Sequence, residues 1–310
     1  VAGSDEYLSL EDLRAGPFYD FQHETAYLEA ASFTKFLIER YGLERFKELY
    51  GLATSDAVHD DALVRELYGR SYSQLEDEWL DYLADQQPDP EQAETWALKV
   101  RSFDLMRRYQ NELDPDARIL PGSPPPDWTS DTVRIFTTRR NEPVNVVVET
   151  ALLAAQDRLY SGDLRGARTL LDDIEVALNA GGAFIQPSLR ARKEIVDLVA
   201  AQDRAVLRAD AAAYVGTLDP ASALARQEAV QEALHPPYTA YFQEVVRLDL
   251  ADDGTSAEGM VLLHAHVVEG SFAGDGQLLA VRFVNTPRGW QMVERRPENV
   301  ALSLPAVSGN

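Results

Sequence analysis

The stretch Leu278–Arg295, LLAVRFVNTPRGWQMVER, decides the fold class of the C-terminal part of the chain. Two apolar runs, Leu278–Asn285 and Trp290–Arg295, flank Pro287-Arg288-Gly289, which is typical of a turn. The stretch therefore predicts two neighbouring antiparallel strands. Upstream runs of the same kind predict two further strands, Val245–Leu250 and Gly259–Val268, with turns at 252–254 and 274–276.

Before these strands the apolar residues recur at helical spacing. In AASFTKFLIERY, Ala30–Tyr41, the stripe runs through Phe33 and Leu37, and we expect it to pack against a helix that carries Leu75, Trp79 and Leu83. Ser73-Gln74-Leu75-Glu76 has the pattern of a capping box for that helix. The other expected helices are Leu43–Tyr50, Asp60–Tyr68, Glu91–Glu112, Val144–Tyr160, Leu164–Asn179, Ser188–Tyr214 and Gln227–Leu234.

Helices followed by a meander of strands indicate the α+β class. We expect three parts: a helical subdomain over 1–87, a linker over 88–182 and an α+β domain over 183–310. The linker contains the Pro-rich segment Pro121–Pro126 and the hairpin formed by the two helices on either side of Ser161-Gly162-Asp163.

Composition limits the partners. The 310 residues include 51 acidic and 29 basic side chains, a formal net charge of -22, which argues against a nucleic-acid partner or an anionic membrane surface. Because there is no cysteine, disulfides, thiolate metal sites and a cysteine nucleophile are excluded. No apolar run approaches the roughly 20 residues of a membrane span, so we expect none in this chain.

Motif searches leave the chain without a complete active site. His23-Glu24-Thr25-Ala26-Tyr27 begins like a zinc-binding H-E-x-x-H helix, but Tyr27 stands where the second histidine is required. We therefore expect no metal ligands in this chain. Phosphate-binding loops, dinucleotide fingerprints and the serine elbow are missing from the sequence as well.

The N-terminal region nevertheless resembles a family. YLEAASF at Tyr27–Phe33, FLIERYG at Phe36–Gly42 and SYSQLEDEWL at Ser71–Leu80 resemble the C-terminal helical part of the gluzincin, or peptidase MA-like, metallopeptidases. The resemblance implies that the zinc helix and the third zinc ligand would lie before Val1, so zinc would belong to a longer parent chain and this chain holds no cofactor.

The first residues contain no initiator methionine, no basic start and no apolar stretch, which suggests a processed or truncated N-terminus. We expect an extracytoplasmic or secreted protein. In one version of this expectation, the missing N-terminal part anchors the protein to a membrane. The resemblance also implies a role for Tyr27, whose hydroxyl would stabilise the oxyanion formed at zinc. The alternative is that Tyr27 is a buried aromatic at the start of a helix.

The last region is similar to the NTF2-like domains, through Ala201–Asp210, Tyr214, Leu218-Asp219 and the final strands. That resemblance implies a cone, in which a curved antiparallel sheet wraps helices and leaves a pocket. Its candidate pocket residues are Tyr214, His264, His266 and Trp290. Alternation places both histidines on one face of a strand. Three interpretations stay open: the histidines are a half-buried or interface pair, they line the pocket, or they bind a metal. Trp290 can equally be a core residue.

Three functional hypotheses follow. The chain is a non-catalytic C-terminal segment of an exported gluzincin-like protein, with an NTF2-like accessory domain. Alternatively it is a stand-alone protein that binds a peptide or a small apolar ligand in the NTF2-like pocket. The third hypothesis is a structural module that forms a homodimer through the C-terminal sheet.

Overall fold

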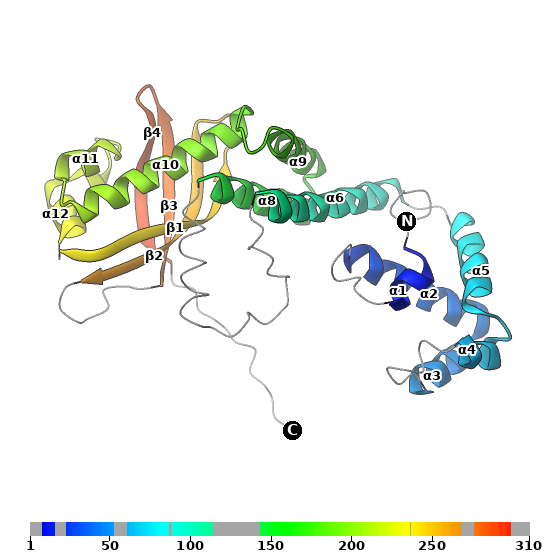
Figure 1. The fold of residues 1–310 in the computed structure, drawn as a ribbon. Coiled ribbons are helices and arrows are strands. Elements are labelled where there is room, and N and C mark those ends of the chain that lie inside the picture. The colour runs from blue at the N-terminus through cyan, green and yellow to red at the C-terminus, as the bar shows by residue number, and fades with distance from the viewer. Residues whose placement is uncertain are drawn as a thin grey trace. The chain divides into compact units, whose positions relative to one another are not determined.

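The computed structural model describes residues 8–15, 23–52, 61–86, 89–113, 143–235, 237–267 and 276–298. Within them lie eleven α-helices and a four-stranded antiparallel sheet, so the α+β class is confirmed (Figure 1). The chain divides into two compact units, Val1–Asp104 and Leu105–Asn310. The three-part division expected from the sequence stays a prediction.

The first unit is helical. Its helices are α1 (Leu10–Ala15), α2 (His23–Tyr41), α3 (Leu43–Leu52), α4 (Asp61–Tyr68), α5 (Tyr72–Ala84) and α6 (Pro90–Glu112), of which α6 continues into the second unit. The buried side chains of one apolar core come from α1, α2, α4 and α5. They are Leu10, Phe36, Leu37, Val64, Tyr68, Leu75 and Trp79.

The packing expected of the apolar stripe on α2 is confirmed. Leu37 is 2% exposed, and Phe33 packs against the same core with its ring 5.5 Å from that of Trp79 in an edge-to-face arrangement. The indole nitrogen of Trp79 also donates a hydrogen bond to Ser32 at 3.2 Å. Two amphipathic helices thus bury each other's apolar faces, which is the main source of helix stability in a small unit.

The expected capping box is shifted by two residues. Ser71, not Ser73, is the N-cap of α5: its hydroxyl accepts from the Gln74 amide at 3.2 Å, and the Gln74 side chain accepts from the Ser71 amide at 3.0 Å. Glu76 does not belong to this capping box. Its carboxylate accepts a hydrogen bond from the Leu10 amide at 2.8 Å. That bond joins the start of α1 to α5.

The second unit combines helices with the sheet. Its helices are α8 (Pro143–Ser161), α9 (Leu164–Asn179), α10 (Pro187–Leu207), α11 (Ala211–Gly216) and α12 (Gln227–Leu234), with the short 3-10 helix η3 (Ala223–Ala225). The strands β1 (Tyr238–Leu250), β2 (Ser256–Val267), β3 (Gln277–Thr286) and β4 (Gly289–Pro297) pair in chain order. All four expected strands are confirmed, and β1 begins at Tyr238 instead of Val245.

One expected helix, Ser188–Tyr214, is wrong as a single element. It is divided into α10 and α11, because Ala209 adopts a left-handed conformation with φ 50° and Asp210 caps a new helix. The Asp210 carboxylate accepts a hydrogen bond from the Ala213 amide at 3.0 Å. Asp is a strong N-cap, and a cap inside an apolar stripe ends the preceding helix.

Helix α10 covers one face of the sheet. It packs on β1 and β4, and α8 packs against both α10 and β1 (Figure 1). Arg192 of α10 is fully buried at this junction, where its guanidinium donates to the Leu248 carbonyl of β1 and to the Thr150 carbonyl of α8. Burial lowers the pKa of Arg192 to about 10, so the side chain is a cation at neutral pH.

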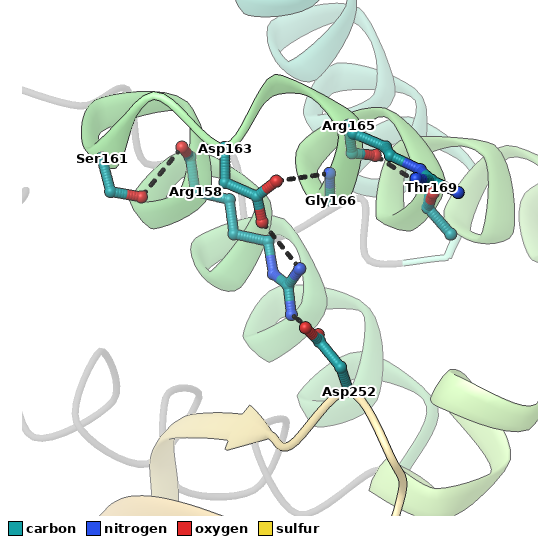
Figure 2. Close-up of polar contacts among 7 residues, drawn as sticks. All are labelled: Arg158, Ser161, Asp163, Arg165, Gly166, Thr169 and Asp252. Atoms are coloured by element: carbon teal, nitrogen blue, oxygen red, sulfur yellow. Dashed lines mark hydrogen bonds and ion pairs between the residues drawn. The ribbon is translucent and has the colours of Figure 1, made fainter.

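A second polar junction ties the helix hairpin to the sheet (Figure 2). The Arg158 guanidinium on α8 bridges two carboxylates, Asp163 at 2.9 Å and Asp252 at 2.9 Å. Asp163 is also the N-cap of α9, accepting from the Gly166 amide at 2.9 Å, and Asp252 lies in the β1–β2 turn. One side chain therefore fixes the α8–α9 turn and attaches it to the sheet.

Candidate ligand pocket

A pocket of about 480 Å³ lies within the second unit, between the sheet and the short helices that follow α10. Helices α11 and α12 gather at the C-terminal end of α10 (Figure 1). The pocket is lined by residues of α11, η3, α12 and all four strands: Tyr214, Leu224, Ala229, Glu232, Ala233, Tyr238, Tyr241, Leu263, Gln277, Leu279, Arg295, Arg296 and Pro297.

The segment after α11 holds the helical side of the pocket against the sheet. Residues Thr217 and Asp219 pair with Met292 of β4: its amide donates to the Thr217 carbonyl and its carbonyl accepts from the Asp219 amide, both at 3.1 Å. The Gln291 side chain adds a bond to the Leu218 carbonyl at 3.2 Å. These bonds satisfy polar groups that an edge strand otherwise leaves open.

Three tyrosines form the aromatic wall. Tyr214 of α11 is buried, and the rings of Tyr238 and Tyr241 on β1 meet edge to face at 5.1 Å. Burial raises the pKa of Tyr241 to about 12, against the opposite effect of the Arg295 cation. The hydroxyl of Tyr241 is therefore a neutral phenol at physiological pH.

Arg295 supplies the charge at this wall. It is half-buried, and its Nη1 donates a hydrogen bond to the Tyr241 hydroxyl at 3.2 Å. Within the part of the chain that the structure describes, no carboxylate lies within ion-pair distance of Arg295. The neighbouring Arg282 and Arg296 differ, because both pair with Glu294. Arg282 and Glu294 are cross-strand partners on the face of the sheet opposite Val281 and Arg295.

A bulge in β4 places Arg295 in the pocket. Phe283 pairs with Met292 and Arg282 with Glu294, so Val293 is an extra residue in β4. Strict alternation would put Arg295 on the face opposite Met292, whereas the bulge returns it to the face of Met292, opposite Val281. This explains why the sequence pattern alone did not single out Arg295.

A buried carboxyl lies near the aromatic wall. Asp203 of α10 is 8% exposed and accepts hydrogen bonds from the amide of Gln243 at 3.1 Å and from its Nε2 at 2.9 Å. Burial raises the pKa of Asp203 to about 7, although the Gln243 bonds and the charges of Arg204 and Arg295 act in the opposite direction. Burial thus favours the neutral form of the Asp203 carboxyl, which lies in the neighbourhood of the Arg295 charge.

The four pocket residues expected from the sequence lie in different places. Tyr214 lines the pocket, and Trp290 is buried but is not one of its lining residues. His264 lies on the other face of β2 from Leu263, stacked on Phe242 at 6.0 Å and 3.8 Å from a Glu244 carboxylate oxygen. The backbone of His266 pairs with Ala240, and its side chain is outside the described residues.

In the first unit Tyr27 lies on α2 with 57% of its surface exposed, so the alternative of a buried aromatic is wrong. Glu29, two residues further on, is fully buried and accepts a hydrogen bond from the Leu8 amide at 3.1 Å. Burial raises the pKa of Glu29 to about 7, and the Leu8 bond acts against this.

The described residues contain no group of three or more His, Asp or Glu side chains that is able to hold a metal ion. Of the helices that the structure describes, none combines the length and apolarity needed to cross a bilayer.

No protein-family model, curated protein or solved structure matches the chain.

Proposed function

We propose that the second unit is an NTF2-like domain that binds a small ligand in its pocket. We further propose that the chain is the non-catalytic C-terminal part of a gluzincin-like protein. The observation that carries the binding function is the pocket itself, with a volume of about 480 Å³. This is within the roughly 300–1,000 Å³ typical of small-molecule sites, which are mostly apolar with a few placed polar groups.

The lining has that composition. Its apolar side chains come from helices on one side and strands on the other: Leu224, Ala229, Ala233, Leu263, Leu279 and Pro297. The tyrosines add flat apolar surfaces with polar tips. The pocket also lies between separate elements that are joined by hydrogen bonds, as at Thr217–Asp219, which supports a preformed cavity.

The gluzincin part of the proposal is supported by the resemblance of the α2 and α5 sequences, and by their packing against each other through Leu37, Phe33 and Trp79. In such a parent protein zinc would supply the activated water, and this chain would contribute a wall that carries Tyr27. The binding function of the second unit does not depend on this part.

A neutral apolar fluorophore, N-phenyl-1-naphthylamine, tests the binding function directly. We expect its emission to rise on addition of the full chain and the rise to saturate. Ala233→Trp fills the pocket from α12 and should abolish the rise, whereas Gln231→Trp on the exposed side of the same helix should leave it unchanged. No saturable rise, or equal effects of the two variants, would contradict the proposed function.

A further inference from the structure

The charge of the pocket differs in sign from that of the chain. The chain carries a formal net charge of -22, whereas the pocket lining contains two arginines, Arg295 and Arg296, and one acidic residue, Glu232. Glu232 is exposed on α12, and Arg296 is exposed and pairs with Glu294. Among the lining residues the half-buried charge is therefore that of Arg295, and the nearby Asp203 carboxyl on α10 is buried where its neutral form is favoured.

The hydrogen bonds of Arg295 and Tyr241 leave donors available. A guanidinium has five N–H donors, and the only bond of Arg295 among the described residues is the one from Nη1 to Tyr241. Tyr241 accepts that bond, so its own O–H is a second donor, and no hydrogen bond from this O–H is formed within the described residues. A cation and a phenol O–H at 3.2 Å from each other form a two-donor site for an anion.

Apolar surface continues from this two-donor site. Leu279 and Leu263 lie on the sheet side, and Leu224, Ala229 and Ala233 on the helix side. A ligand that meets both parts carries a charged head on an apolar body. A planar carboxylate matches the two donors, because its two oxygens accept in parallel from an arginine and a neighbouring hydroxyl.

We infer that the pocket selects an apolar carboxylate, with its head group on Arg295 and Tyr241 and its body against the tyrosines and the aliphatic lining. This inference rests on the proposed binding function and adds the chemical class of the ligand. Arg295 is the specificity-determining residue: it distinguishes the carboxylate from a neutral molecule of the same shape.

Two probes that differ only in the head group test the inference: 2-naphthoate and 2-naphthalenemethanol, titrated calorimetrically into the full chain at pH 7.5. We expect 2-naphthoate to bind at least about tenfold more tightly than the alcohol, since only its carboxylate forms charge-assisted hydrogen bonds with the arginine. Arg295→Gln should remove this preference, because it weakens the binding of 2-naphthoate much more than that of the alcohol.

Arg282→Gln is the matched control, because it removes the same charge from the opposite face of the sheet, and we expect it to change neither affinity. If Arg295→Gln does not fold, Tyr241→Phe replaces it, with a loss of about threefold or more for 2-naphthoate and a smaller loss for the alcohol. Equal binding of the two probes would overturn the inference and leave the binding function intact. Binding of neither probe would overturn both.

Discussion

Asp203 on α10 and Gln243 on β1 are joined by two hydrogen bonds, from the backbone amide of Gln243 at 3.1 Å and from its Nε2 at 2.9 Å. The pair links the long helix to the sheet close to the aromatic wall. It also keeps a carboxyl in a buried place, where the neutral form is favoured.

Stability should therefore depend on the protonation of Asp203. An Asp in the unfolded chain titrates near pH 3.9, whereas the folded pKa is about 7. Between these values the folded state binds more protons, so its stability falls as pH rises from about 4 to about 7 and is level above. Urea unfolding at pH 5 and pH 7.5 should show this fall, by about 2.5 kcal/mol, because each pH unit between pH 5 and the folded pKa contributes about 1.36 kcal/mol.

Asp203→Asn should reduce the fall, since the substitution removes the titrating group. Asp197→Asn, on the exposed surface of the same helix, should retain it. A pH dependence identical in the chain and in Asp203→Asn would show that Asp203 does not titrate in this range.

Gly166→Ala should destabilise α9, although alanine normally stabilises a helix relative to glycine by about 1 kcal/mol. A Cβ at position 166 would overlap the Asp163 carboxylate and the Arg158 guanidinium (Figure 2). The Asp163 cap would have to move, at a cost of about 1–2 kcal/mol. Thermal unfolding measures the effect, with Gly216→Ala, whose Cβ meets open space, as the control. A higher melting temperature for Gly166→Ala would contradict the described cap.

Leu37→Ala should cost the first unit about 2–5 kcal/mol, the range for a buried leucine whose cavity does not collapse. Leu37 is 2% exposed and faces Trp79 and Leu75 in one core. Leu43→Ala, at a site that is 46% exposed, should cost much less. Guanidinium unfolding followed by tryptophan fluorescence compares the two variants, and equal losses would argue against the described core.

Cleavage between α9 and α10 distinguishes the two divisions of the chain. The structure predicts that a chain cut at a protease site inserted after Gly182 stays associated on size-exclusion chromatography, because α8 packs on both α10 and β1. The division expected from the sequence predicts instead that a 183–310 fragment elutes alone. The elution volume of that fragment therefore decides between the two divisions.

The spacing of the apolar residues predicts most helices and strands, but it does not identify the residues that line the pocket. Helix Leu164–Asn179 has the bounds expected, because its apolar stripe and its Asp163 cap agree. Ser188–Tyr214 looked continuous, since nothing in its apolar spacing shows that Ala209 turns left-handed. A local cap favours the end of a helix, whereas a continuous apolar stripe favours its continuation. Which of the two determines the helix boundary depends on the contacts of the folded chain.

The residues that line the pocket are harder to predict from the sequence than the helix boundaries, because they are brought together by distant parts of the chain. Tyr214 was identified through a family resemblance, whereas Tyr241 precedes the predicted strand and Arg295 reaches the pocket only because of the bulge at Val293. Bulges and strand extensions are set by pairing with distant residues, which one sequence does not reveal.

Ring-labelled tyrosine NMR tests the central claim, that the pocket of the second unit binds an apolar carboxylate. On titration with 2-naphthoate, we expect the ring signals of Tyr214, Tyr238 and Tyr241 to shift with one common affinity, because the aromatic probe lies against them. The signals of Tyr41 and Tyr82, in the core of the first unit, should stay in place. A titration that leaves the three pocket tyrosines unshifted, or shifts all five alike, would contradict the account.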